Sequence, residues 1–272
     1  MRFPLLKIAL ATSLAAMASP LAAQNITIAP GDRILENAFN AEEIQFYHDS
    51  VILPNPQQQQ AGMNIQTISG FNSGFVYDFC ADFYMGTDVA STSYNYTSGL
   101  SAGISDPIRR SQIEVLISNT LPEFNSLLQD YIADTGSWNQ PMTPEDIAAY
   151  QTAYDNLLAY AGGIQIALWE IIHEDSANRS VNSDGSIAGD FYVGMGDAGT
   201  APGNLAGTRA EEFLTNIRST TNPWTNQGGW YIYFADAVEA DQQDRIWITS
   251  VPEPSATLLG ALGFLMILRR RR

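Results

Sequence analysis

The chain contains a single cysteine, Cys80, which is the first candidate for chemistry. It lies in the run Tyr77-Asp78-Phe79-Cys80-Ala81-Asp82, an aromatic segment that we expect to form an extended strand. The first 23 residues, described below, indicate export, and an exported protein normally pairs its cysteines. An odd cysteine is therefore an inert buried thiol, one half of an intermolecular disulfide, or a reactive group. The third alternative makes Cys80 a nucleophile, because a cysteine thiolate is intrinsically reactive.

A second candidate, Gln165, lies in the run Ile164-Gln165-Ile166-Ala167-Leu168-Trp169-Glu170. This run begins a predicted helix from Ile164 to His173 that is otherwise largely apolar. Gln165 and Trp169 are four residues apart and therefore share one face of that helix. Gln165 is either a polar helix residue bonded to backbone or water, or a functional group that acts with Cys80.

These two runs resemble the motifs of the thioester domain family (TQXA type) of bacterial surface proteins. That family has an aromatic-Cys-hydrophobic motif, matched here by Phe79, Cys80 and Ala81. Further along the chain it has a hydrophobic-Gln-x-Ala-hydrophobic-Trp motif, in which a threonine commonly precedes the glutamine; Ile164 stands there in this chain. The residues that match the second motif are Gln165, Ala167, Leu168 and Trp169.

The resemblance implies an internal thioester between Cys80 and Gln165. The Cys80 thiolate would attack the Gln165 carboxamide and release ammonia, which requires a fold that holds the pair in a near-attack geometry. Trp169 would exclude water, with Ala167, Phe79 and Tyr77 in support. An amine on a surface or matrix target would then open the thioester and be linked to the glutamine carbonyl. The protein would be a single-use covalent adhesin, not a turnover enzyme, and would need no cofactor and no metal.

Two other classes of function remain open. His48 or His173 could act with Cys80 as a cysteine hydrolase dyad, with Asp78 or Asp82 orienting the ring, and this reading predicts turnover. Alternatively, the protein is a structural, exopolysaccharide-associated matrix protein in which Cys80 is inert.

A metal site is a weaker candidate. Oxygen atoms of Asn182, Asp184 and Asp190 could bind calcium, but their spacing does not match an EF-hand loop, and a solvated turn is the alternative.

The first 23 residues have the layout of a secretory signal peptide. Arg2 and Lys7 form the charged start, an apolar stretch follows, and the small pair Ala22-Ala23 precedes the expected cleavage point. The apolar stretch is short for a membrane span of about 20 residues. We therefore expect the chain to be exported.

Residues 251–272 resemble a PEP-CTERM sorting signal. Val251-Pro252-Glu253-Pro254 is stiff, an apolar segment follows from about Ala256 to Leu268, and four arginines end the chain. The apolar segment is shorter than a permanent span, so a transient inner-membrane anchor fits it better than a tail anchor. The resemblance implies that exosortase is the sorting partner and that the mature protein resides at the cell envelope, outer surface or extracellular matrix.

Between these ends, residues 24–250 are acidic and contain no lysine; the whole chain has 13 basic and 29 acidic residues. We expect no nucleic-acid partner, because phosphate contacts need basic residues. A surface without lysine would also spare a thioester from attack by its own amines. Acidic composition bias explains the same feature.

The body is predicted to be one α+β domain, with a β-sandwich or barrel-like sheet and an inserted helical subdomain. Strands are expected before and after the helices. The expected strands are 26–28, 51–53, 65–68, 74–77, 79–84, 229–234 and 245–249. The expected helices begin at Pro107, Leu121, Thr143, Ile164 and Arg209, with Gly162-Gly163 interrupting the pattern and a loop from Ser176 to Gly207.

Overall fold

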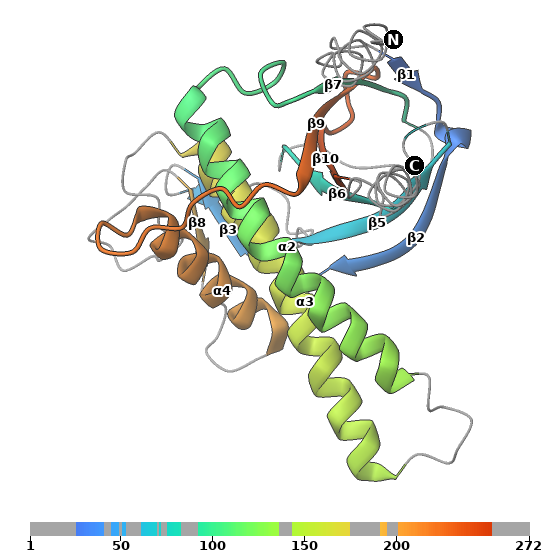
Figure 1. Cartoon of the computed structure of the whole chain (residues 1–272), viewed down its shortest axis with the longest axis vertical. Helices are drawn as coiled ribbons and strands as arrows, with labels where there is room; N and C mark the ends of the chain where they lie inside the picture. Colours follow the sequence, from blue (N-terminus) through green and yellow to red (C-terminus); the bar gives the residue numbers. More distant parts are fainter. Residues whose placement is uncertain are drawn as a thin grey trace, which may run out of the picture.

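The computed structural model describes residues 26–40, 45–48, 51–52, 61–69, 71, 75–82, 92–135, 143–174, 191–194 and 201–251. Within them a curled antiparallel sheet lies beside three α-helices (Figure 1). The helices come between strands β7 and β9 in the sequence, so the predicted α+β class with a helical insertion is confirmed.

The curled sheet has seven strands in the spatial order β1-β7-β9-β10-β6-β5-β2, and every neighbouring pair is antiparallel. A second, three-stranded sheet has the order β4-β3-β8. The strands of the curled sheet are β1 (Ile26–Ile28), β2 (Arg33–Asn40), β5 (Gly62–Ile68), β6 (Val76–Cys80), β7 (Tyr94–Ser98), β9 (Trp230–Ala237) and β10 (Arg245–Ser250). The strands of the small sheet are β3 (Gln45–His48), β4 (Val51–Ile52) and β8 (Phe191–Gly194).

Two apolar clusters fill the two faces of the curled sheet. Alternate side chains of a strand point to opposite faces, so Phe79 and Ile246 belong to the large core shared with the helices, whereas Val76 and Trp247 belong to the smaller core inside the curl. Arg33 of β2 donates a hydrogen bond to the carbonyl oxygen of Thr92, next to β7, and so links opposite ends of the sheet across the curl.

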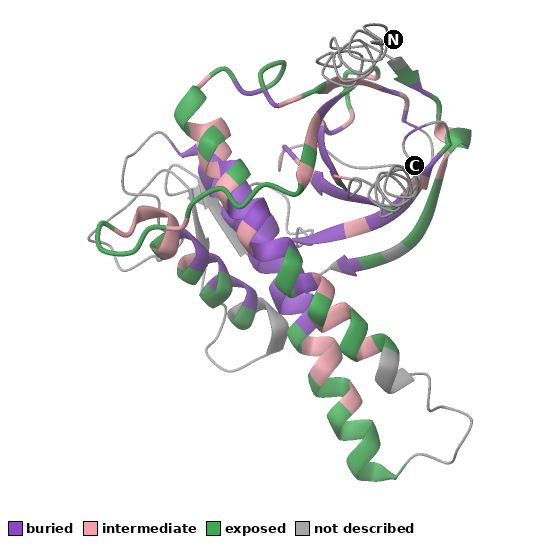
Figure 2. Cartoon of the chain, viewed as in Figure 1, coloured by how far each residue is buried: buried purple, intermediate pink, exposed green. Residues whose placement is uncertain are grey.

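Helix α3 (Pro144–His173) carries Gln165 and runs along the sheet. Its start is the predicted capping box: the Thr143 side chain accepts from the Asp146 N–H, and the Asp146 carboxylate accepts from the Thr143 N–H. The half of α3 that meets the sheet is buried and the other half projects into solvent (Figure 2). The C-terminal half of α3, from Leu157 to Ile171, is therefore kept helical by its burial rather than by helix propensity.

The expected break at Gly162-Gly163 is wrong, because α3 continues through both glycines. Gly163 marks a close approach to helix α4 (Ala201–Arg218): a Cβ atom there would lie 2.7 Å from Arg209 Cβ and 3.2 Å from the Ala206 carbonyl oxygen. The glycine thus serves packing between helices, and the packing compensates for its weak helix propensity.

Three other expectations are corrected. The helices expected from Pro107 and Leu121 form one helix, α2 (Pro107–Thr135), with Pro122 inside it; buried Leu121 and Phe124 keep the chain against the core on both sides of the proline. The strands expected at 74–77 and 79–84 are one strand, β6, which ends at Cys80. The expected loop at 176–207 contains β8 and the start of α4.

Both predicted sorting segments lie outside the described residues, apart from Val251, as do Asn182, Asp184 and Asp190. Among the residues that are described, no helix is long and apolar enough to span a membrane.

The close approach at Gly163 predicts that Gly163→Ala destabilises the fold. The new methyl group would have to displace α4 at Arg209 Cβ and the Ala206 carbonyl oxygen. This would cost about 1–3 kcal/mol, which exceeds the gain in helix propensity of about 1 kcal/mol. Thermal and urea unfolding would measure the change. Gly31→Ala is the control, because nothing lies within 4 Å of a Cβ at that position. Equal stability of the parent and Gly163→Ala would contradict the packing role.

Candidate functional site

Cys80 and Gln165 meet where the β6 ladder ends. The Cys80 N–H donates to Gln165 Oε1 at 2.8 Å, and Gln165 Nε2 donates to the Cys80 carbonyl oxygen at 2.8 Å. Gln165 is fully buried, and Cys80 is partly exposed. The structure therefore brings together the two residues that the sequence motifs single out.

The direction of the Cys80 backbone follows from the strand pairing. Residues of an antiparallel strand alternate between pairs that exchange hydrogen bonds and pairs that do not. The Ala81 N–H donates to the Asp244 carbonyl oxygen at 2.8 Å, so Ala81 is bonded toward β10 and Cys80 points its N–H and C=O toward the β5 side. On that side the ladder ends at the pair Asn64–Asp78.

The Gln165 carboxamide takes the next place in that ladder. It makes the same two-bond exchange with Cys80 that a residue of a neighbouring strand would make. The contacts also fix the orientation of the amide, because a backbone N–H can pair only with the amide oxygen and a carbonyl only with the amide nitrogen. Without Gln165, the partly buried Cys80 N–H would lose its partner, at a cost of up to about 1–3 kcal/mol.

A buried arginine contacts the sulfur of Cys80. Arg245 is the residue of β10 directly opposite Cys80, in a pair that does not exchange backbone hydrogen bonds, and side chains in such pairs lie close together. Arg245 Nη1 is 2.8 Å from Cys80 Sγ and 3.8 Å from Asp78 Oδ1. Arg245 and Asp78 are 1% and 0% exposed, respectively, so this is a buried ion pair.

Burial has the largest effect on the pKa values of Cys80 and Asp78. It raises the pKa of the Cys80 thiol to about 11; the positive charge of Arg245 opposes the rise, and Asp78 and Asp82 add to it. Burial also raises the pKa of Asp78, against the opposing charges of Arg245 and Arg33. Burial alone would lower the pKa of Arg245, but its negative neighbours outweigh that effect and the pKa is raised. The resting sulfur is therefore a thiol beside a fixed positive charge.

The predicted supporting residues occupy two places. Trp169, Ala167 and Phe79 are buried in the large core, with Trp169 one helical turn after Gln165. The Tyr77 hydroxyl donates to Asn125 of α2 at 2.6 Å, and its ring packs against Phe124 and Trp230, toward the other end of β6. Tyr77 thus contacts α2 and β9 rather than the Cys80–Gln165 pair.

The two histidines differ in position. His173 Nε2 lies 3.0 Å from the Ala81 carbonyl oxygen, so Nε2 carries the hydrogen and donates to the backbone. His48 lies in β3 of the small sheet. The sulfur of Cys80 contacts Arg245 instead, and Asp78 pairs with that arginine. Within the described part of the chain, no cluster of His, Cys, Asp and Glu could hold a metal ion.

Sequence reasoning missed Arg245 as part of the site. The available signal was a lone arginine at the start of an otherwise apolar predicted strand, Arg245–Thr249. Such a charge is rarely buried without a partner, but only the strand register shows that the partners are Asp78 and Cys80.

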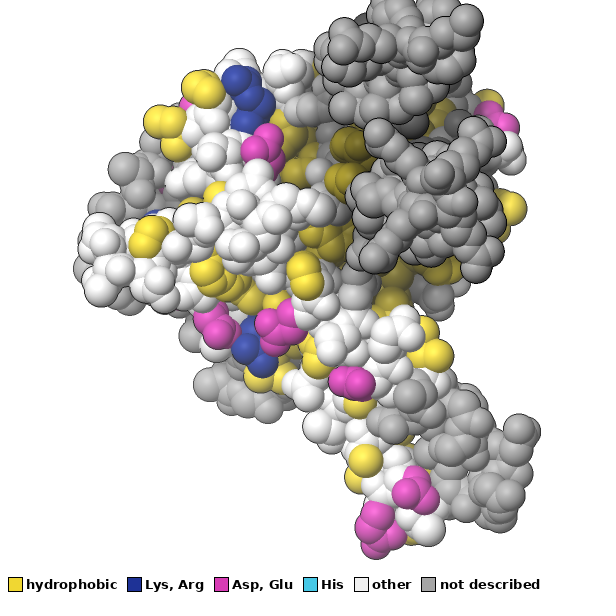
Figure 3. All heavy atoms as spheres, in the orientation of Figure 1, with side chains coloured by type: hydrophobic (Ala, Val, Ile, Leu, Met, Phe, Trp, Pro, Cys, Tyr) yellow, Lys and Arg dark blue, Asp and Glu magenta, His cyan; other side chains and the backbone are white. Residues whose placement is uncertain are grey.

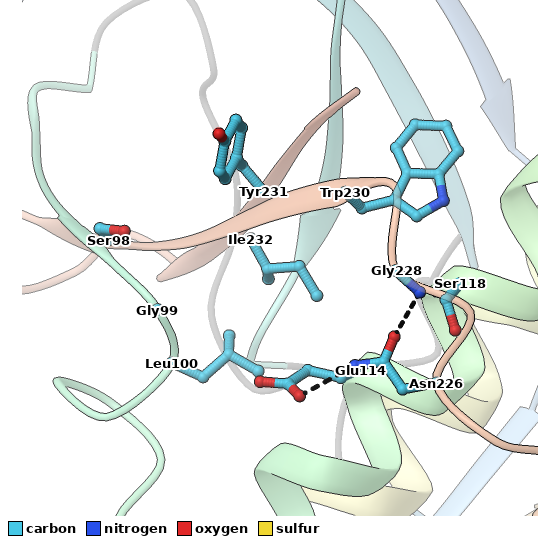
Figure 4. A pocket seen from close by; sticks show the side chains of 10 residues that line it. All are labelled: Ser98, Gly99, Leu100, Glu114, Ser118, Asn226, Gly228, Trp230, Tyr231 and Ile232. Carbon is cyan, nitrogen blue, oxygen red and sulfur yellow. Dashed lines mark hydrogen bonds between the residues drawn. The ribbon is translucent and has the colours of Figure 1, made fainter. Parts of the chain in front are cut away.

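A separate pocket of about 280 Å³ lies at the start of β9. Trp230, Tyr231 and Ile232 form one wall, and Glu114 of α2 faces them (Figure 4). Asn226 Nδ2 donates to Glu114 at 3.2 Å, and the Asn226 side-chain oxygen accepts from the Gly228 N–H at 2.8 Å. Its strand residues pair with the end of β10, whereas Cys80 pairs with the start of β10, so the pocket is not part of the Cys80 site.

No family model and no curated protein matches the chain. Three solved structures are similar to it. The N-terminal thioester domain of a surface protein from Clostridium perfringens is 10% identical, with a TM-score of 0.38, over 77% of this chain and 99% of that one. The N-terminal thioester domain of the fibronectin-binding protein SfbI from Streptococcus pyogenes is 12% identical, with a TM-score of 0.39, over 78% and 95%. The N-terminal domain of the Streptococcus pyogenes pilus tip adhesin Cpa is 11% identical, with a TM-score of 0.40, over 78% and 95%. These are distant similarities, and the contacts of Cys80 and Gln165, rather than the similarities, carry the functional proposal.

The environment of Cys80 predicts an unusually high thiol pKa. Gln165→Met removes the carboxamide and keeps a side chain of similar length. In this variant we expect the rate of Cys80 alkylation to rise with pH and to reach half of its maximum at a pH of about 11. Burial keeps the thiol protonated below that pH, and only the thiolate reacts.

Iodoacetamide labelling followed by mass spectrometry would measure this midpoint. The control is Ser111→Cys on the exposed side of α2, in a Cys80→Ala background, with an expected midpoint of about 8.5. The same midpoint for both cysteines would show that burial does not govern Cys80.

Proposed function

We propose that Cys80 and Gln165 form an internal thioester through which the protein attaches covalently to an amine-bearing target. The observation that carries the proposal is the pair of hydrogen bonds between the Gln165 carboxamide and the Cys80 backbone. They hold an otherwise inert amide beside the only cysteine of the chain, in a fixed orientation, with the amide buried.

One of these hydrogen bonds would assist attack on the amide carbon. The Cys80 N–H already donates to Gln165 Oε1, the atom on which negative charge develops when sulfur adds to the carbonyl, so it would act as an oxyanion donor. The S–C bond forms, the C–N bond breaks, and the thiol proton leaves with the amide nitrogen as ammonia. No oxidant, metal or cofactor enters this balance.

The surroundings would preserve the product. A thioester is lost to water, and the buried position of Gln165 beside the core that contains Trp169 and Phe79 limits the access of water. Cys80 is the less buried residue of the pair, so an incoming amine would approach the Gln165 carbonyl from its side. That amine would form an amide with the Gln165 carbonyl, and its proton would pass to the departing sulfur, so each molecule reacts once.

The same proposal includes export and sorting. The segments at 1–23 and 251–272 support a signal peptide and exosortase-dependent sorting through a transient anchor, which would place the mature protein at the cell surface or in the extracellular matrix. The body has no lysine with which a thioester could react within the molecule. Figure 3 shows the basic side chains of one face as small isolated spots. Because phosphate contacts need clustered basic residues, we propose an amine-bearing target rather than nucleic acid.

The intact mass of the purified body tests the proposal. We expect the parent to lack the mass of one ammonia, because thioester formation expels it, and Cys80→Ala to have its full mass. Incubation with methylamine should restore a free thiol and add methylamine to Gln165, as mapped by tandem mass spectrometry. A parent of full mass, with Cys80 free to alkylate, would refute the thioester and favour a matrix protein in which Cys80 is inert. Catalytic turnover of an ester or amide substrate that depends on His173 would favour the hydrolase.

A further inference from the structure

Arg245 carries a positive charge in the protein interior, where an isolated charge is unfavourable. It is 1% exposed, and moving an ion from water into a protein interior costs several kcal/mol unless other charges compensate. Arg245 Nη1 lies 2.8 Å from Cys80 Sγ and 3.8 Å from Asp78 Oδ1. The ion pair with Asp78 is long for a hydrogen bond, so the closest acceptor of Arg245 Nη1 is the sulfur.

A second arginine acts on the same carboxylate. The guanidinium of Arg33 lies 4.7 Å from the centre of the Tyr94 ring, and its charge acts on Asp78 and on Arg245. Two arginines therefore share one buried carboxylate inside the curl. With a neutral sulfur this group has a net charge of +1, whereas a thiolate at Cys80 makes it neutral. Asp82, which also acts on Cys80 and is less buried, adds negative charge at the margin.

We propose that Arg245 stabilises the Cys80 thiolate when it attacks Gln165 and again when it leaves the thioester. This inference rests on the proposed thioester and adds a catalytic residue that none of the sequence motifs contains. Arginine stays protonated and accepts no proton. It therefore stabilises charge on sulfur without acting as a base, unlike the histidine of a hydrolase dyad.

One contact serves both steps because both pass through charge on the same sulfur. In formation, the thiol proton departs with ammonia as the S–C bond forms. In opening, an amine adds to the thioester carbonyl, the C–S bond breaks, and the departing thiolate takes up the proton that the amine loses. Arg245 Nη1 donates to the sulfur while it is anionic, and a charge-assisted hydrogen bond of this kind is stronger than a neutral one.

The opposite charges of Arg245 and Asp78 allow a test with opposite signs. Arg245→Gln removes the positive charge and should slow methylamine opening by about tenfold to a hundredfold. Asp78→Asn removes the negative charge from the same site with little change of shape. It should make opening faster than in the parent, because the thiolate then has less negative charge beside it.

Two further variants complete the set. Arg245→Lys keeps the charge and should recover part of the rate lost in Arg245→Gln. Arg33→Gln is the matched control: it removes an arginine from the same group that does not contact the sulfur, and its effect should be smaller than that of Arg245→Gln. A purely structural role for the ion pair predicts instead that Arg245→Gln and Asp78→Asn slow opening alike.

The experiment measures methylamine opening of the full body by intact mass over time, with circular dichroism and thermal unfolding to confirm folding. If Arg245→Gln does not fold or carries no thioester, the rates of opening of the parent, Asp78→Asn and Arg245→Lys still test the inference. The inference is overturned if Asp78→Asn and Arg245→Lys both open more slowly than the parent and by the same factor. It is also overturned if the parent and all variants open at the same rate. A parent without the ammonia deficit overturns the proposed function itself, and this outcome is distinct from equal rates in a parent that carries the thioester.

Discussion

The two hydrogen bonds between Gln165 and the Cys80 backbone are the constraint on which the site depends. Strand alternation turns the Cys80 N–H and C=O away from β10, and the β5 ladder stops before it reaches them. A helix side chain therefore has to complete the pairing, and this requires α3 to lie against the sheet at a fixed rotation. The capping box at Thr143, the buried half of α3 and the close α3–α4 packing at Gly163 all serve that position.

The same strand geometry separates two tasks around Cys80. Its backbone N–H donates to the Gln165 amide oxygen, while its side chain lies on the face of the sheet that carries Arg245 and Asp78. In the proposed reaction, the main chain of Cys80 would hold the electrophile, and its side chain would be a nucleophile beside buried charges. Burial raises the pKa of the Cys80 thiol to about 11, so an unreacted thiol is protonated at neutral pH.

The sequence predicts the pair but not its surroundings. Motif order singled out Cys80 and Gln165, and Thr143-Pro144-Glu145-Asp146 located the start of α3, because both signals are local. The helix through Gly163 was missed because its reason is the approach of α4, which is remote in sequence. Likewise, the roles of Arg245 and Asp78 depend on the register of β10 against β6, which local patterns do not specify.

A crystal structure of the processed body at high resolution would test the central claim most directly, through the electron density between Cys80 Sγ and Gln165 Cδ. The account predicts continuous density at bonding distance, loss of the Gln165 amide nitrogen, retention of the hydrogen bond from the Cys80 N–H to the Gln165 carbonyl oxygen, and Arg245 still beside the sulfur. Separate sulfur and carboxamide density, with the amide still bonded to both backbone atoms of Cys80, would contradict it.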